Sequence, residues 1–189
     1  MFAYCGNNPV CYIDESGHFK KPWITVVNDG GGGLSTDSPF YWNDSSRPYY
    51  SEIAANEERN AMHRILNENQ NAKFRGVNVI NIPMKNTYAF SCGLIFVSTA
   101  IDYNEAGSNT LKHEYGHYVQ LMEIGPVNYV TKILIPSVNG FWNPPAIPYY
   151  SQPWEYLADL FGGVERIGYN HTPNAHQDAL DYWAQIINN

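Results

Sequence analysis

The chain has 189 residues, enough for one domain with a continuous hydrophobic core plus an appended segment, so it needs no disulfide or metal staple to fold. Its 18 acidic and 11 basic residues give a formal charge of -7 at pH 7, and no Lys/Arg cluster exceeds the pair Lys20-Lys21, which disfavours nucleic-acid binding. No stretch approaches the roughly 20 apolar residues of a membrane span, so we expect none.

Residues 2–17 read FAYCGNNPVCYIDESG, a segment whose Asn-Pro and Ser-Gly pairs mark turns. It resembles the end of the Rhs repeat-associated core, where a stretch of the form YAY-x-x-NNPV-x-Y-x-DPSG closes the repeat shell before a variable toxin domain. Glu15 stands where that family usually has Pro. The resemblance implies that residues 1–19 end an Rhs-like core segment or linker, and that residues 20–189 form a bacterial toxin or effector domain.

An effector of this kind is secreted or delivered as part of a larger exported polypeptide, and a cognate immunity protein is an expected partner. The first residues lack the basic start and the apolar run of a secretory signal, so we expect them to come from the interior of a longer chain. The three cysteines are Cys5, Cys11 and Cys92. A disulfide between Cys5 and Cys11 and free thiols both stay open, because the spacing fits neither a zinc knuckle nor a redox pair.

The first half of the chain alternates short elements and loops. Trp23–Val27 is β-branched and predicts a strand, and Gly30–Gly33 lacks the Gly-Lys-Ser/Thr ending of a phosphate loop, so we expect a flexible connection. A loop covering residues 37–50 follows. Apolar spacing then predicts a helix over Ser51–Asn69. Its single histidine, His63, is expected to be structural or exposed rather than a ligand.

Two strand regions come next. Gly76–Pro83 alternates apolar and polar residues, as a half-buried strand does, and Ala89–Ala100 is more apolar and is broken at Cys92-Gly93. The next helix along the chain, the motif helix, carries His113-Glu114-Tyr115-Gly116-His117, an HExxH pattern, and this order of helix, strands and motif helix resembles that of a zincin fold. We therefore expect an α+β chain with a small mixed sheet, a motif helix and further helices.

The motif is His113-Glu114-Tyr115-Gly116-His117, the HExxH signature of zinc metallopeptidases. Ser108 or Asn109 could cap its helix, and Gly125-Pro126 could end it. On a helix the two histidines lie about 40° apart on one face and about 6 Å apart along the axis, so both can bind one ion. Glu114 lies beside them and can act as general base on a water. Chance produces such a pattern roughly once in 100 chains of this composition.

A catalytic zinc site needs a third protein ligand. The segment from Pro153 to Gly162-Gly163 reads as a short helix with a first-turn proline and a glycine stop, and it carries Glu155 and Asp159 four residues apart. This arrangement resembles the gluzincin site of thermolysin-like peptidases. The resemblance implies that Glu155 is the third ligand and that Asp159 orients a motif histidine, most simply His113.

Other interpretations of these acids stay open. Asp159 could itself be the ligand, both acids could lie on a solvated helix face, and Glu165 is a weaker ligand candidate. Residues 127–136 fit a helix or a buried strand, and the Pro- and Tyr-rich residues 139–153 form a loop that lines a groove or serves as covering. A last helix is expected from Thr172-Pro173 onward.

The motif and its context predict zinc-dependent hydrolysis of a peptide bond in a protein or peptide substrate. The oxyanion-stabilising donor stays unassigned among four downstream residues, namely Tyr149, Tyr150, His171 and His176. Two other functions compete. One is a catalytically inactive, peptidase-like binding module or structural domain of an Rhs shell, and the other is a zinc hydrolase with a non-peptide substrate.

Overall fold

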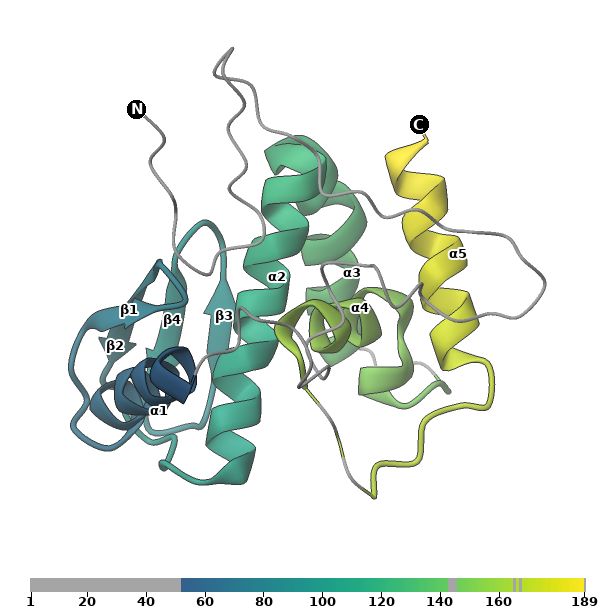
Figure 1. Cartoon of the computed structure of the whole chain (residues 1–189). Coiled ribbons are helices and arrows are strands. Elements are labelled where there is room, and N and C mark those ends of the chain that lie inside the picture. Colours follow the sequence, from purple (N-terminus) through teal and green to yellow (C-terminus); the bar gives the residue numbers. More distant parts are fainter. Residues whose placement is uncertain (1–51, 143–145, 165, 167, 189) are drawn as a thin grey trace, which may run out of the picture. The chain divides into compact units, whose positions relative to one another are not determined.

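The computed structural model describes residues 52–142, 146–164, 166 and 168–188 (Figure 1). The expected α+β class with a small mixed sheet is confirmed. The elements are, in chain order, α1 (Glu52–Leu66), β1 (Ala72–Phe74), β2 (Val77–Ile82), β3 (Ala89–Ser91), β4 (Ile95–Ser98), α2 (Glu105–Tyr129), a π-helical segment (Val130–Leu134), α3 (Ile135–Trp142), a 3-10 turn (Tyr149–Ser151), α4 (Pro153–Gly162) and α5 (Ala175–Ile187).

Several expectations lie outside the described residues: the Rhs-like segment with Cys5 and Cys11, the strand Trp23–Val27, and the glycine run Gly30–Gly33. The described part divides into two compact units. Residues 52–89 and 94–108 belong to the first, and residues 90–93 with those from 109 onward belong to the second. No helix in the described ranges has both the length and the apolar character to cross a membrane.

The first unit contains a hairpin that the sequence did not reveal. β1 pairs antiparallel with β2, and the two-residue turn Arg75-Gly76 has positive φ at both positions, 47° and 84°. Positive φ at both central residues is the geometry of a type I′ turn, for which Asn-Gly rather than Arg-Gly is the usual signal. The Arg75 side chain donates from Nε and Nη2 to the Glu58 carboxylate of α1, at 3.0 Å each, which ties α1 to the hairpin.

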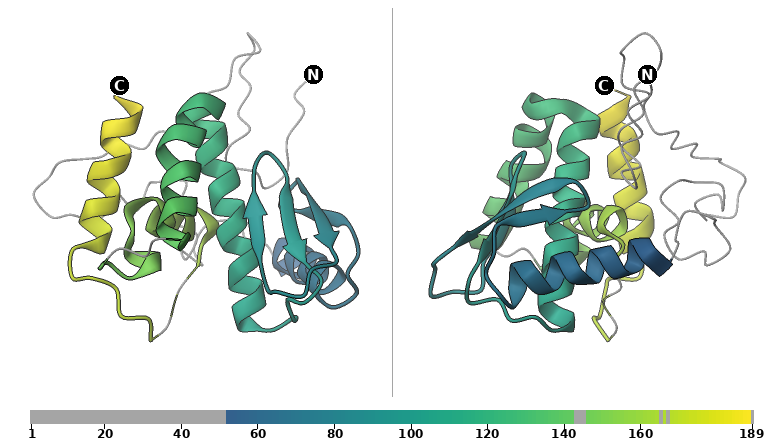
Figure 2. Two further views of the ribbon diagram at one scale, coloured as in Figure 1. Left: turned by 180° about the vertical axis from the view of Figure 1, so that it is seen from behind. Right: turned by 60° about the vertical axis from the view of Figure 1, so that its left-hand side comes forward.

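The sheet has the strand order β1-β2-β4-β3 and is mixed, because β2 runs parallel to β4 and antiparallel to β1. Alternate residues of β2 and β4 are buried, as expected for strands with one covered face. In Figures 1 and 2, α1 lies across one face of this sheet. The apolar core of the unit comes from both layers: Met62, Ile65, Leu66, Phe74, Val77, Val79, Ile95 and Val97.

Helix α2 begins earlier than the sequence indicated. Its cap is Asn104, whose Oδ1 accepts a hydrogen bond from the Gly107 amide at 2.9 Å, so the expected cap at Ser108 or Asn109 is wrong. The predicted break is present at Gly125, where φ is 76°. The reason for the early start is that a polar cap upstream satisfies the amides of an extra turn.

The segment after the break is helical, which decides between the two alternatives for residues 127–136. It continues through the π-helical segment into α3, which takes up residues 139–142 that we expected in a loop. Within α3, a Cβ on Gly140 would lie 2.4 Å from the end of the Gln152 side chain, so the glycine allows this side chain to approach the helix closely.

Helices α4 and α5 complete the second unit. α4 begins with Pro153 in its first turn and ends at Gly163, which has the left-handed conformation of φ 69° and ψ 44°. α5 begins at Ala175, three residues after the expected Thr172. The two helices pack through the Phe161 and Trp183 rings, whose centroids lie 5.0 Å apart.

Candidate metal centre

Two glycines bring α2 and α4 into backbone contact. A Cβ on Gly116 would lie 1.8 Å from the Ala158 carbonyl oxygen, and one on Gly162 would lie 2.1 Å from the Lys112 carbonyl oxygen. Any larger residue at either position would push the helices apart. The close crossing therefore places the turn with Glu155 and Asp159 directly against the HExxH turn of α2.

Three side chains converge at this crossing. The Nε2 atoms of His113 and His117 lie 3.0 and 3.3 Å from Glu155 Oε2, and the two imidazole rings are nearly perpendicular, with centroids 4.7 Å apart. All three residues are buried, Glu155 completely. Their ligand atoms lie within 4.8 Å of one another, so this group could hold a metal ion. It is the group with this property among the described residues.

Asp159 lies behind the first histidine rather than in the group itself. Its Oδ1 is 2.7 Å from His113 Nδ1, the ring nitrogen that faces away from Glu155. A carboxylate in this position fixes the tautomer of a ligating imidazole and raises its basicity. The geometry favours this role over that of a ligand, and the burial of Glu155 and Asp159 rules out a solvated helix face.

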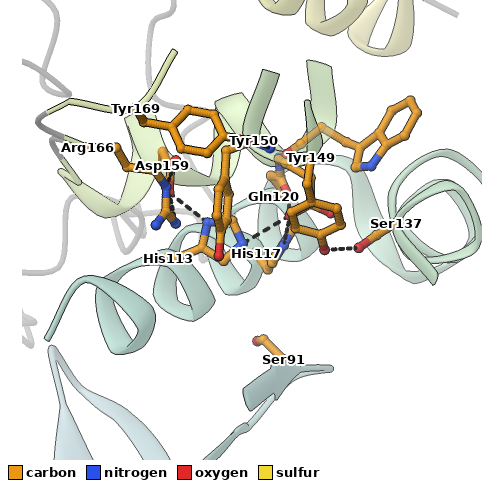
Figure 3. A network of polar contacts seen from close by, with 12 residues as sticks. Ser91, His113, His117, Gln120, Ser137, Tyr149, Tyr150, Asp159, Arg166 and Tyr169 are labelled. Atoms are coloured by element: carbon orange, nitrogen blue, oxygen red, sulfur yellow. Dashed lines mark hydrogen bonds and ion pairs between the residues drawn. The ribbon is translucent and has the colours of Figure 1, made fainter. Parts of the chain in front are cut away.

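Arg166 forms two hydrogen bonds with the same carboxylate. The sequence analysis did not identify this residue. Its Nε donates to Asp159 Oδ2 at 2.6 Å, and its Nη2 donates to Oδ1 at 2.9 Å. The guanidinium carbon also lies 3.3 Å from the centre of the Tyr150 ring. Arg166 thus balances the Asp159 charge and holds Tyr150 against the site (Figure 3). Glu165, the weaker ligand candidate, lies outside the described residues.

Gln120 contacts the Nδ1 atom of the second histidine, as Asp159 contacts that of the first. Its Oε1 lies 2.7 Å from His117 Nδ1, and its Nε2 donates to the Trp154 carbonyl oxygen at 2.8 Å. The sequence analysis missed this residue. The signal was its position three residues after His117, because residues spaced i, i+3 are neighbours on a helix surface.

The electrostatics of the metal-free group are dominated by opposite charges. Burial alone would lower the pKa of His113, but its hydrogen bonds with Asp159 and Glu155 outweigh burial and raise that pKa to about 10. Burial would raise the pKa of Glu155, yet the charge of His117 and hydrogen bonds from both histidines hold it well below its usual range. The two acids beside His113 therefore favour its protonated form.

Glu114 has a different environment from that of the other acids. It is buried, and its Oε2 has no hydrogen-bond partner among the described residues. Burial raises the pKa of its carboxyl group, and the nearby charges of His117 and His113 partly oppose this effect. A buried carboxylate with a free oxygen and a raised pKa has the properties of a general base.

Two tyrosines approach the group on the side of α2 that carries the histidines (Figure 3). The Tyr150 ring meets His113 edge to face, with centroids 5.5 Å apart. The Tyr149 hydroxyl lies 3.2 Å from Ser137 Oγ, and burial together with the charge of Glu155 raises its pKa. This part of the expected 139–153 loop thus lies against the site.

The remaining histidines have contacts of other kinds. His171 Nδ1 lies 3.3 Å from Ser151 Oγ, and the His176 ring packs against Tyr156 with centroids 5.8 Å apart. His63 lies in the other unit, where its Nδ1 is 3.3 Å from Glu68 Oε1 and its ring contacts Tyr103. None of the three belongs to the candidate metal group found among the described residues.

Comparison of the chain with models of protein families, with curated proteins and with solved structures gave no match. The function is therefore inferred from the residues of the site.

Proposed function

We propose that this chain is a zinc-dependent, gluzincin-like metallopeptidase in which His113, His117 and Glu155 hold the metal ion. The observation that carries the proposal is the convergence of both Nε2 atoms on Glu155 Oε2, at 3.0 and 3.3 Å. Zinc has tetrahedral ligands at about 2.0–2.2 Å, so neighbouring ligand atoms lie about 3.3–3.6 Å apart. The second Glu155 oxygen, Oε1, is buried without a hydrogen-bond partner, as expected for a carboxylate built to meet a cation.

Zinc, when bound, would supply Lewis acidity that makes water nucleophilic at neutral pH and polarises a carbonyl group. Glu114 accepts the proton of the attacking water at its free carboxylate oxygen, and it returns this proton to the leaving amine when the C–N bond breaks. The raised pKa of Glu114 supports this role, because a stronger base takes the proton more readily. Asp159 and Gln120 each engage an Nδ1 atom and leave Nε2 facing the centre.

Tyr149 is the best supported of the four donors considered for the developing oxyanion. Burial and the negative charges of Glu155 and Glu114 raise the pKa of its hydroxyl, so the donor proton stays in place at neutral pH. Tyr150 is less suited, because its ring is held between Arg166 and His113. His171 and His176 contact Tyr156, Ser151 and Tyr169 instead.

The fold family and the delivery of the protein are part of the same proposal. The order of helix, mixed sheet, motif helix and ligand helix supports a zincin-like fold. The Rhs-like residues 2–17 support a toxin or effector domain that is secreted or delivered within a larger polypeptide, with a protein or peptide substrate and a cognate immunity protein.

The test compares the wild-type chain with Glu114→Gln and with Glu105→Gln, a matched control on the exposed first residue of the same helix. Metal content is measured by mass spectrometry, and hydrolysis is measured on an unfolded protein substrate. We expect about one zinc per chain in all three proteins. Cleavage should fall by about 10²–10⁴-fold in Glu114→Gln alone, because the general base is lost.

A wild-type chain that holds no zinc after zinc addition refutes the proposal. A chain that binds zinc but cleaves no peptide is instead a binding module or acts on another substrate. Retained cleavage in Glu114→Gln removes Glu114 as the base.

A further inference from the structure

Gln120 is fully buried and yet polar, which requires an explanation. An unpaired amide in an apolar environment is unfavourable, because it loses its hydrogen bonds to water and gains none. Both amide atoms of Gln120 are paired, one with His117 and the other with the backbone of α4. The neighbouring Gln152 is equally buried, but neither of its amide atoms has a partner among the described residues. Burial alone therefore does not produce the Gln120 pairing.

The partners of Gln120 determine the tautomer of His117. The Trp154 carbonyl oxygen can only accept a hydrogen bond, so the amide atom that faces it at 2.8 Å must be the NH₂ group. The remaining atom, Oε1, can only accept, so His117 Nδ1 at 2.7 Å must carry a proton. A histidine that binds a metal ion is neutral and has one N–H. With that proton on Nδ1, the lone pair for a metal ion is on Nε2, the atom that faces Glu155.

The same amide also links two ligands that lie on different helices. Trp154 directly precedes Glu155, so the bond from Gln120 anchors the first turn of α4 to α2 beside the second histidine. Rotation of the amide would break both bonds at once. The orientation of His117 and the position of Glu155 are thus coupled through one side chain.

The acceptors behind the two histidines differ in charge. His113 donates to the Asp159 carboxylate, which Arg166 balances, whereas His117 donates to a neutral amide. A second carboxylate at position 120 would add negative charge beside Glu114, Glu155 and Asp159. Gln120 therefore orients His117 without increasing the repulsion among the buried acids.

We propose that Gln120 is a positioning residue of the metal centre, which fixes the tautomer of His117 and anchors the helix that carries Glu155. This inference rests on the proposed zinc site. It does not depend on the substrate or on peptide hydrolysis.

The test uses Gln120→Met, which keeps the size of the side chain but loses both hydrogen bonds, and Gln152→Met as the matched control. Zinc Kd is measured by competition with a chelator, and circular dichroism of the metal-free proteins reports folding. We expect Gln120→Met to bind zinc about 10–100-fold more weakly, as loss of an outer partner typically does. Gln152→Met should stay within threefold of wild type.

Nitrogen NMR of the metal-free proteins supplies a readout that a packing role would not move. The His117 Nδ1–H signal should be protected from exchange in wild type and in Gln152→Met, and it should lose this protection in Gln120→Met. If Gln120→Met does not fold, Gln120→Asn replaces it, because that side chain is too short to reach both partners, and the same loss is expected.

Three results overturn the inference while leaving the zinc site intact: a Gln120→Met affinity within threefold of wild type, an equal loss in Gln152→Met, or a His117 Nδ1–H signal that stays protected in Gln120→Met. A wild-type chain that binds no zinc overturns the proposed function as well, so the two failures are distinguishable.

Discussion

Alanine in place of Gly116 is expected to disable the metal centre while most of the fold persists. The new Cβ would lie 1.8 Å from the Ala158 carbonyl oxygen and within 2.8 Å of two further backbone atoms of that residue. Backbone atoms of a helix cannot rotate away as a side chain can. A Cβ contact needs at least 3.0 Å, so α4 would have to retreat from α2 by at least 1.2 Å.

This displacement matters more for metal binding than for folding. Metal–ligand distances tolerate only about 0.2 Å, and a shift of α4 would carry Glu155 away from both histidines. Overpacking is unfavourable by about 1–3 kcal/mol, but the higher helix propensity of alanine offsets about 1 kcal/mol of this. The free energy of unfolding of the metal-free protein should therefore fall by no more than about 2 kcal/mol. Zinc affinity should fall by at least about 100-fold, beyond the loss expected for an outer partner.

The assay measures zinc Kd by chelator competition and the free energy of unfolding by urea in the presence of chelator. Gly140→Ala is the matched control, because its Cβ would meet only the end of the flexible Gln152 side chain and not helix backbone atoms. It should retain zinc affinity within fivefold. A Gly116→Ala protein that binds zinc as tightly as wild type would show that the close helix crossing does not set the ligand geometry.

Three further predictions concern protons and proton donors. The pKa of His113 in the folded protein is raised to about 10, so its contribution to the stability of the metal-free protein should be complete below pH 6.5 and lost as the pH rises through about 10. The pKa of Glu155 is lowered in the folded protein, so the stability should also fall as the pH drops below about 4.5. Urea unfolding in the presence of chelator across this pH range checks both changes in stability. Zinc binding at pH 7 should release about one proton, which calorimetry in buffers of different ionisation enthalpy measures. Binding without proton release would contradict a protonated His113. Tyr149→Phe should lower kcat by about 10²–10³-fold with unchanged zinc affinity, whereas Tyr129→Phe, which loses only a hydrogen bond to the Ser91 carbonyl, should keep kcat; equal rates would remove Tyr149 from catalysis.

Helix α4, which carries Glu155, was predicted closely, since its signals are local. The α4 boundaries follow from a first-turn proline and a glycine stop. Other elements depended on weaker signals. β1 is too short for its periodicity to be visible and its turn is Arg-Gly, while the cap of α2 lies at Asn104, upstream of two equally polar residues.

The sequence by itself determined which residues share a helix face: His113 with His117, and Glu155 with Asp159. Helical periodicity makes such relations a matter of spacing, so they can be calculated without knowing the rest of the fold. Only the tertiary structure decided which faces meet. Three contacts join separate elements: the approach of α2 to α4 at Gly116, the hydrogen bond from Gln120 to Trp154, and the hydrogen bonds from Arg166 to Asp159. Contacts of this kind depend on how packed helices dock, and spacing along the chain does not encode that docking.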